Sequence, residues 1–517
     1  MDRRTTLAII LCLLIYLGWQ KFYLDPRFAH EAAVKGSQTE LGTNQGSPVL
    51  NSTHTPEAVA AQQKIPSKKL KLQTATGDAW ISDSGQFFSE WTLKTYKTEI
   101  KTDAPFITLR DVTQQQGEMT LAFDDPKLTY LNDVQGTLTT TSQGAVWSFE
   151  DQNVKMTREF FSTDQKPFVD VRVSLEFKGM APRYAFISLT GQSFENDPEA
   201  QDRQLLYWTN QSIERVVLKD AITQKEVSSP VKYIASANRY FIMSVVAQSP
   251  LESTGLVQAY GPNAGRVSLV YPIVSKNLTI PTRVYFGPKE LNLLRHVEPT
   301  LDHTVDFGWF TIFAYPLLKI LKWLYQFVLN YGVAIIILTL LLKVVTYPLT
   351  YKSMKSMKKM AKLQPQLQKL REKYKDDKEA LNREMLTMMR SNGYNPMAGC
   401  LPMIIQMPIF FALYRVLYSS IELYHAPFAL WIHDLSSRDP FYVTPILLSL
   451  TMFLQQKLTP ATTTDPAQAK MMQLMPLIFG AFMLPLPAGL TIYMLVNAIA
   501  SIVQQLILNK KLDATAA

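Results

Sequence analysis

The sequence predicts a polytopic α-helical membrane protein, with six transmembrane helices and a large antiparallel β-sandwich domain outside the cytoplasm. Three observations lead to this fold class. Residues 331–350 form an apolar run that matches the ~20 residues needed to span a bilayer core. Residues 399–508 are dense in Leu, Ile, Met and Phe. Residues 71–305 instead alternate in short segments broken by Gly, Asp, Asn and Pro, which is typical of strands joined by turns.

The composition excludes several classes of function. The 517 residues carry a formal net charge of +9, but the lysines crowd beside apolar runs, which fits the positive-inside rule better than nucleic-acid binding. We therefore expect no direct sequence-specific nucleic acid binding. The two cysteines lie in apolar segments and the six histidines are scattered. Neither a disulfide framework in the polar domain nor a structural metal is expected.

Residues 1–24 are predicted to be an uncleaved transmembrane anchor with a cytoplasmic N-terminus. Two arginines precede an apolar run that ends at Tyr23. A cleaved signal peptide is the alternative, but no Ala-x-Ala site follows the run. Residues 25–70 are rich in Ala, Ser, Thr, Gln and Gly, and they predict a flexible linker.

Residues 71–305 are predicted to form the β-sandwich, because even, short strands fill most of this region. Helical periodicity begins only at Glu290. Sandwiches of this size also occur in sugar-processing enzymes, but no pair of acids stands out at the strand ends. A structural or interaction module is therefore favoured over an enzyme. The clearest alternating segments are 156–161, 168–177, 185–189, 240–247, 267–271 and 282–286.

Residues 306–330 are apolar and aromatic with two lysines, Lys319 and Lys322. This segment fits either a membrane span or an amphipathic helix in the interface. The stretch from Lys352 to Arg390 holds twelve Lys and Arg, which predicts a cytoplasmic location. If the anchor crosses outward, residues 331–350 must cross back as the second transmembrane helix. The interfacial helix is therefore predicted, with both lysines toward water.

The remaining chain is predicted to be a cytoplasmic helical hairpin (351–398), transmembrane helices 3–6 (399–508) and a cytoplasmic tail (509–517). Pro365 is expected to interrupt the first hairpin helix. A methionine stripe on the hairpin indicates either packing of the hairpin on itself or an adaptable surface for partners. Its members are Met354, Met357, Met360, Met385 and Met388.

Polar residues inside the predicted spans are concentrated in the cytoplasmic half of the membrane. Lys343 is the charged member, and Gln406, Asn497 and Ser501 accompany it. Thr339, in the same span as Lys343, is a further candidate groove residue. One interpretation is that Lys343 extends its ammonium to the inner interface. The other is a water-accessible cavity open to the cytoplasm and closed outward, because ionisable residues in spans usually face such cavities.

Several motifs closely resemble the YidC family of bacterial membrane protein insertases, in the same order along nearly the whole chain. The long block through residues 395–435 is highly specific. The motifs are Tyr347-Pro-Leu-Thr350, Leu363-Gln-Pro365, Asn395-Pro-Met-Ala-Gly-Cys-Leu-Pro402, Gln406-Met-Pro-Ile-Phe410, Ala426-Pro-Phe-Ala-Leu-Trp-Ile-His-Asp-Leu435 and Thr464-Asp-Pro466.

The resemblance implies an inner-membrane protein whose β-sandwich is periplasmic, with both termini in the cytoplasm. It implies insertion and folding of nascent inner-membrane proteins, alone or with the Sec translocon, through a hydrophilic groove open to cytoplasm and lipid. No nucleotide or other cofactor is implied, nor catalysis. The hairpin is the expected contact for a ribosome or targeting particle, because the tail is short, and membrane lipids are further partners.

The resemblance also implies where this chain departs from its family. Lys343 occupies the position of a groove residue that is commonly arginine. Lysine keeps the charge but loses the planar donor fork. Two adjacent tyrosines that often face substrate read Tyr493-Met494 here, and Arg415 is an additional charge. Two alternatives remain: a small-solute transporter with a periplasmic binding domain, although no internal repeat is evident, and a membrane-tethered sandwich enzyme.

Overall fold

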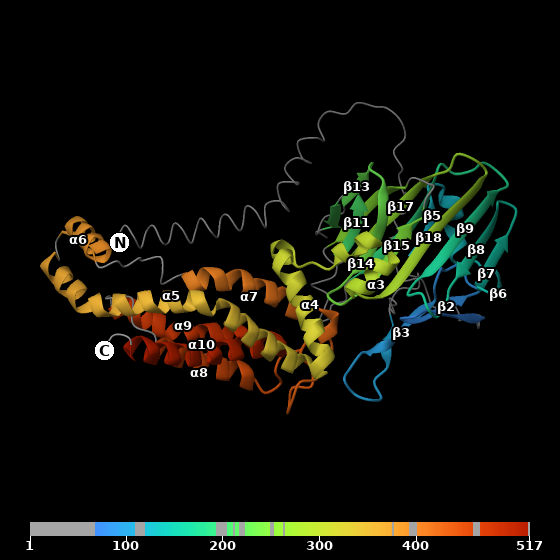
Figure 1. The fold of residues 1–517 in the computed structure, drawn as a ribbon. Helices are drawn as coiled ribbons and strands as arrows, with labels where there is room; N and C mark the ends of the chain where they lie inside the picture. Colours follow the sequence, from blue (N-terminus) through green and yellow to red (C-terminus); the bar gives the residue numbers. More distant parts are fainter. Residues whose placement is uncertain are drawn as a thin grey trace. The chain divides into compact units, whose positions relative to one another are not determined.

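The computed structural model (Figure 1) describes most of the chain after the linker. The predicted anchor, the linker up to residue 67 and the motif that begins at Asn395 lie largely outside the described residues. The described residues are 68–108, 119–192, 204–209, 212–216, 223–248, 253–261, 264–374, 377–391, 401–458 and 466–514.

The predicted β region forms antiparallel sheets, and every alternating segment named above is a strand. The strands are β1 (Lys69–Gln73), β2 (Gly77–Ser82), β3 (Glu90–Lys97), β4 (Phe106–Thr108), β5 (Met119–Phe123), β6 (Thr137–Thr141), β7 (Gly144–Glu150), β8 (Val154–Phe161), β9 (Val169–Phe177), β10 (Tyr184–Gln192), β11 (Gln204–Thr209), β12 (Ser212–Val216), β13 (Thr223–Val227), β14 (Val231–Ala237), β15 (Phe241–Ala247), β16 (Thr254–Gly261), β17 (Ala264–Pro272) and β18 (Asn277–Pro288).

These strands build three sheets within the described residues. The nine-stranded sheet has the order β12-β11-β14-β15-β18-β9-β8-β7-β6, and the five-stranded sheet has the order β13-β16-β17-β10-β5. Strands β1 to β4 form the third sheet in sequence order. Side chains from all three sheets share one hydrophobic core, in which alternate residues of a strand such as β9 are buried, as the period of two requires.

A charged side chain, Arg158 of β8, is completely buried in this core. It occupies the inward-facing register of its strand, between Met156 and Phe160. Its guanidinium lies 4.2 Å from the ring centroid of Phe87 and 4.9 Å from that of Trp147. It donates a hydrogen bond to the carbonyl oxygen of Gly85. Within the described residues, Nε and Nη2 of Arg158 have no hydrogen-bond partner.

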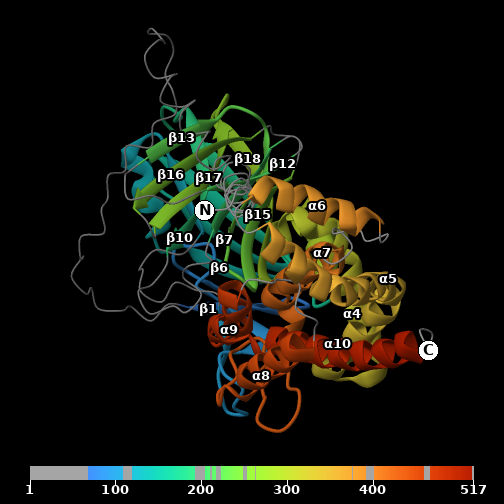
Figure 2. The ribbon, with the colours of Figure 1, turned by 90° about the vertical axis from the view of Figure 1, so that its left-hand side faces the viewer.

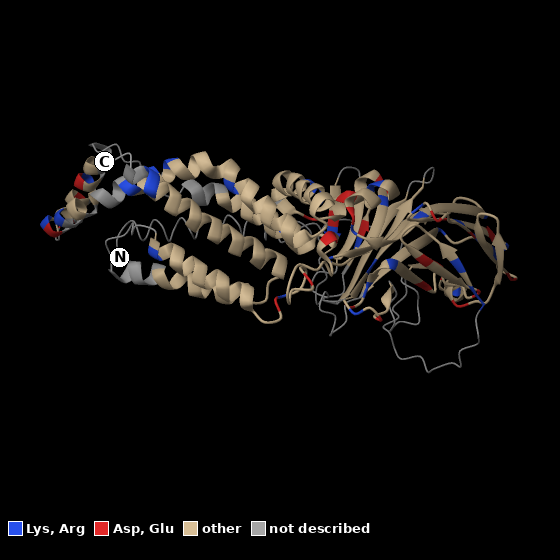
Figure 3. Cartoon of the chain, turned by 60° about the horizontal axis from the view of Figure 1, so that its bottom comes forward, with Lys and Arg blue, Asp and Glu red and all other residues tan. Residues whose placement is uncertain are grey.

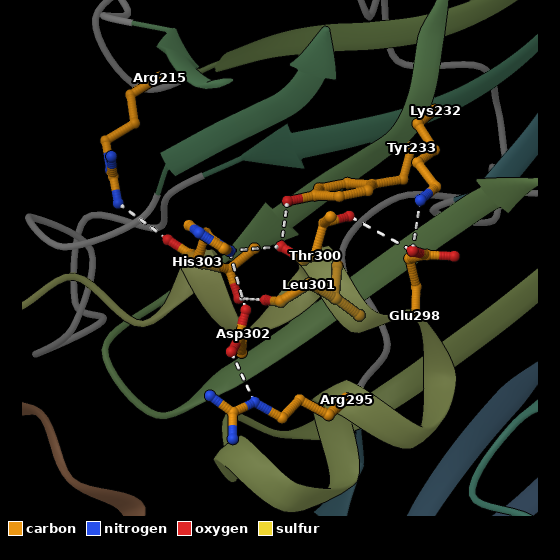
Figure 4. Close-up of polar contacts among 10 residues, drawn as sticks. Arg215, Lys232, Tyr233, Arg295, Glu298, Thr300, Leu301, Asp302 and His303 are labelled. Atoms are coloured by element: carbon orange, nitrogen blue, oxygen red, sulfur yellow. Dashed lines mark hydrogen bonds and ion pairs between the residues drawn. The ribbon is translucent and has the colours of Figure 1, made fainter. Parts of the chain in front are cut away.

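The chain leaves the sandwich through α3 (Leu291–Val297) and the short 3-10 helix η4 (Pro299–Thr304). Apolar residues of both pack on the nine-stranded sheet. Ion pairs surround this apolar contact (Figure 4): Lys232 Nζ lies 2.6 Å from Glu298, and Arg295 Nε lies 2.7 Å from Asp302. These contacts fix where the chain turns toward the helical region.

The helical region follows, and its helices occupy the predicted segments. They are α4 (Thr311–Val328), α5 (Tyr331–Lys373), α6 (Lys378–Ser391), α7 (Leu401–Ser419), α8 (Val443–Leu458), α9 (Pro466–Met483) and α10 (Ala488–Ala514), with the short 3-10 helices η2 (Pro126–Asn132), η5 (Gly308–Phe310) and η7 (Ile421–Leu423) elsewhere in the chain.

Helix α10 packs against both α5 and α8, α8 also packs against α9, and α4 packs against α5 and α7, as Figure 2 shows from the side. Charged residues, frequent on the strands and near α6, are sparse along these helices (Figure 3). By length and composition, two helical stretches among the described residues could cross a membrane: Tyr331–Lys358 and Ala488–Lys511. The structure therefore does not confirm the count of six spans.

Helix α5 corrects the expectation that Pro365 interrupts the first hairpin helix. The helix continues through both Pro348 and Pro365 and ends only at Lys373. A proline inside a helix removes one backbone hydrogen bond and crowds the preceding turn. Here the flanking helical turns hold the helix together, so the second span and the first arm of the hairpin are one element.

Helix α4 corrects the expectation that both of its lysines face water. Lys319 is exposed, but Lys322 Nζ lies 3.0 Å from Glu422 and 3.2 Å from Glu290. One face of α4 is buried against its neighbours, whereas the opposite face exposes large apolar side chains. The buried residues are Ala314, Leu317, Leu318, Leu321 and Leu324, and the exposed ones include Ile312, Phe313, Ile320, Trp323 and Phe327.

Candidate functional site around Lys343

The site is built on the contact between α5 and α10. Lys343 lies on α5 and is half-buried, and its Nζ donates a hydrogen bond of 2.7 Å to Oγ of Ser501 on α10. The hydroxyl of Ser501 in turn donates to the main-chain carbonyl of Asn497, also at 2.7 Å. Residues four apart on a helix face the same side, so this second bond stays within α10.

The charge of Lys343 is not compensated by an acid in the described part of the chain. Lys343 Nζ donates its hydrogen bond to a neutral hydroxyl, whereas Lys322 pairs with two carboxylates. A charged side chain in the hydrocarbon region costs at least about 2.5–3.5 kcal/mol on insertion scales. An uncancelled ammonium held there therefore creates a positive field beside α10.

A second polar contact joins α7 to α10. Nε2 of Gln406 donates to the phenol oxygen of Tyr493 at 3.1 Å, and the Tyr493 side chain is buried in the core of the helical region. Tyr493 precedes Ser501 by eight residues, which is about 12 Å along a helix. The sequence had placed Gln406 and Lys343 at similar depth, but their partners lie about two turns apart on α10.

The other predicted residues do not join a shared polar contact. Thr339 is buried, and its hydroxyl donates to the carbonyl of Ile335 in its own helix. Met494 packs partly buried against apolar residues of the helical core. The sequence had not indicated that Ser501 binds Lys343, because the register between two helices 158 residues apart is set by packing.

The hairpin methionines are divided between packing and exposure. Met385 and Met388 of α6 pack against Leu363 and Leu367 of α5, which supports self-packing for these two. Met354 is buried, and Met357 is half-buried. The side chain of Met360 lies outside the described part of the structure.

A polar network that the sequence analysis missed lies before α8. The buried carboxylate of Asp439 accepts hydrogen bonds from the backbone N–H and the hydroxyl of Thr444, both at 2.8 Å. It also accepts from the backbone N–H of Phe441 at 3.0 Å and from the indole of Trp431 at 3.1 Å. The hydroxyl of Thr444 also contacts that of Thr491 on α10, at 2.9 Å. An acid just before an apolar helix is a capping signal, so this role could have been found.

Comparisons with known proteins agree with this architecture. A family model described as the YidC periplasmic domain matches residues 69–320, and one described as the 60Kd inner membrane protein matches residues 323–515. The membrane protein insertase YidC of Geobacter metallireducens is 32% identical over 540 residues, covering 100% of each chain. That of Geotalea daltonii is 33% identical over 532 residues, covering 99% of this chain and 100% of the relative.

Among solved structures, a crystal structure of an active YidC insertase with its first transmembrane domain resolved matches 86% of this chain and 93% of that chain. Its sequence identity is 18% and its TM-score is 0.36. The curated relatives are named as insertases, so the comparisons do not support the transporter alternative.

Fold and comparisons together define an inner-membrane protein with a β-rich periplasmic domain and a set of apolar helices. The chain belongs to the YidC family. The resemblance found in the sequence motifs is thereby confirmed.

Proposed function

We propose that this protein is a membrane protein insertase and chaperone, which inserts and folds inner-membrane proteins. The observation that carries the proposal is the half-buried ammonium of Lys343, bound to a hydroxyl rather than to an acid. Membership of a family whose curated relatives are named membrane protein insertases supports it. No catalysed bond-making, metal or cofactor enters the proposal.

The proposed site is a hydrophilic groove open to the cytoplasm and to lipid, containing Lys343, Gln406, Tyr493, Asn497 and Ser501. Thr339, which is buried, and Met494, which is partly buried, pack beside it. An acidic or polar segment of a nascent chain would be attracted to the ammonium and would have less hydrocarbon to cross. Because exposed apolar side chains dominate the outer surfaces of α8 and α9, hydrophobic parts of the substrate would leave directly into lipid.

The proposed topology has six spans with both termini in the cytoplasm and the sandwich in the periplasm. Helices α5, α7, α8, α9 and α10 supply five spans, and residues 1–24 supply the first. These five helices contain between 16 and 43 residues each, which supports the count. The exposed aromatic face of α4 supports its placement in the lipid interface.

The first proposed partner follows from the charge of the α5–α6 hairpin. The basic hairpin of α5 and α6 would contact a ribosome or targeting particle, with the half-buried Met357 as the methionine on its surface. Components of the Sec translocon and membrane lipids complete the set of partners. Depleting the protein and following the insertion of a short two-span substrate tests the function directly. Unchanged insertion in depleted cells would exclude it.

The charge at position 343 gives the sharpest test of the site. We expect Lys343→Arg to support insertion, whereas Lys343→Ala slows insertion of substrates with an acidic translocated segment about tenfold, the effect of ~1.4 kcal/mol. Radiolabelled pulse-chase with protease protection measures the insertion rate. Lys319→Ala on α4 is the matched control, because it removes an exposed lysine outside the site. Equal rates for all four proteins would show that Lys343 only extends to the interface.

A further inference from the structure

The lysine at the centre of the proposed site is held by a hydroxyl from another helix. Lys343 Nζ and Ser501 Oγ lie 2.7 Å apart, although their residues are 158 positions apart in the sequence. Lys343 follows the start of α5 by twelve residues, about 18 Å, and Ser501 follows the start of α10 by thirteen, about 20 Å. The two residues therefore lie at matching depths from the same ends of their helices.

The donors and acceptors in this contact can be assigned without ambiguity. The hydroxyl proton of Ser501 is directed at the carbonyl of Asn497, so Oγ has only lone pairs to offer Lys343. An ammonium has three N–H donors and no acceptor. One donor binds Ser501, and no other residue in the described ranges accepts from the remaining two. The arrangement fits a charged lysine.

The chemical nature of the partner matters more than its strength. A carboxylate at this position would cancel the charge of Lys343, as Glu290 and Glu422 do for Lys322. With no partner, a long lysine stem tends to extend its ammonium to the membrane surface. A neutral hydroxyl keeps the ammonium from extending to the membrane surface and leaves its charge uncancelled.

We propose that Ser501 is a positioning residue, which holds the ammonium of Lys343 at depth in the inner half of the membrane while leaving its charge available. A carboxylate on a substrate segment then takes the two free N–H donors. This inference rests on the proposed function, because it gives the same site its preference for acidic segments.

The test compares two substrates that differ only by Asp or Asn in the translocated segment. The readout is the ratio of their insertion rates into membranes that contain full-length protein. We expect Ser501→Ala to lower the preference for Asp about threefold, the size of an average interhelical hydrogen bond in a membrane. Ser501→Thr keeps a hydroxyl and restores the preference.

Thr451→Ala on α8 is the matched control. Its hydroxyl donates to the carbonyl of Leu447 at 2.7 Å, the same bond within one helix that Ser501 makes, but among the described residues no lysine binds it. We expect this variant to leave the Asp preference unchanged. A fall equal to that of Ser501→Ala would assign the effect to helix structure and overturn the inference.

The same ratio measured in the Lys343→Ala background separates positioning from structure. If Ser501 acts through Lys343, the double variant behaves as Lys343→Ala alone. If Ser501→Ala slows both substrates equally, leaves the ratio unchanged, or acts fully without Lys343, the inference is wrong. If Lys343→Ala itself leaves the ratio and both rates unchanged, the proposed function of the site fails instead.

Discussion

The carboxylate of Asp439 shows how much one buried acid can organise. It accepts four hydrogen bonds at the start of α8, from Trp431, Phe441 and Thr444. Burial by itself raises the pKa of Asp439, but the bonds from Thr444, then those from Phe441 and Trp431, outweigh burial and bring the pKa below its ordinary value. The folded protein therefore favours the ionised acid.

We predict that Asp439→Asn lowers the free energy of unfolding by about 1–3 kcal/mol at pH 7, since charged hydrogen bonds are lost. An acid whose pKa is lowered by folding stabilises the protein at pH values above its unfolded pKa. This stabilisation is lost as the pH falls through the folded pKa. The difference between wild type and variant should therefore shrink below about pH 4. Thermal unfolding of the purified protein at several pH values measures it.

An exposed carboxylate provides the control for this pH dependence. The Glu99 side chain is 61% exposed, and Glu99→Gln should leave the unfolding curve nearly unchanged at every pH. A constant difference between wild type and Asp439→Asn down to pH 3 would contradict the assignment of the charged state.

Arg158 is a second buried charge, and we expect its charge, unlike that of Asp439, to add little to stability. Its guanidinium makes one hydrogen bond and two aromatic contacts, while two of its nitrogens have no partner among the described residues. Replacing a buried ion by an apolar side chain of similar volume is often neutral or stabilising. We predict that the free energy of unfolding of Arg158→Met is within about 1 kcal/mol of the wild-type value, or higher than it.

Arg158→Ala serves as the comparison, because it leaves a cavity as well as removing the charge. It should destabilise the protein by about 3 kcal/mol. Calorimetry of both variants separates the two effects. If Arg158→Met is as damaging as Arg158→Ala, the charge itself stabilises the core, and the prediction is wrong.

At the scale of elements, one close contact between α8 and α9 depends on a glycine. A Cβ added at Gly480 would lie 1.5 Å from Oγ and 2.8 Å from Cβ of Ser449. Small residues allow membrane helices to approach in this way. We predict that Gly480→Ala destabilises the purified protein by about 1–3 kcal/mol through overpacking.

A second substitution tests the cause. Ser449→Ala removes the nearer atom and should recover part of the stability in the double variant, giving a favourable coupling in a double-mutant cycle. Thermal unfolding in detergent measures all four proteins. Additive effects would mean that Gly480 is required for a reason other than its contact with Ser449.

At the scale of the whole molecule, local sequence patterns were enough to predict the helices and strands. They were not enough to predict the contacts of the candidate site, because the residues in contact are far apart in the sequence. The alternation of residues 156–161 predicted a strand, because strand register needs only neighbouring residues, and Arg158 lies on the inward-facing side of that strand. The charge on Lys343 was evident from its apolar surroundings. Its partner Ser501 was not, because the register of α5 on α10 depends on packing along both helices.

The same limit explains the two corrections. Lys322 was expected in water because its segment was predicted to be an amphipathic interfacial helix, but Glu290 and Glu422, from other segments, pair with it. Pro365 was expected to break a helix because the local penalty is large. Helix α5 nevertheless continues through Pro365, and helix propensities, which describe single residues, do not predict this.

Helix α5 has a mechanical consequence. Its 43 residues make a rod about 65 Å long, roughly twice the ~30 Å hydrocarbon thickness of a bilayer. Lys343 and the first arm of the hairpin therefore lie on one continuous helix. Any rotation or tilt of this helix would move the ammonium of Lys343 relative to Ser501, and Pro348 and Pro365 are the two positions at which the helix lacks a backbone N–H donor.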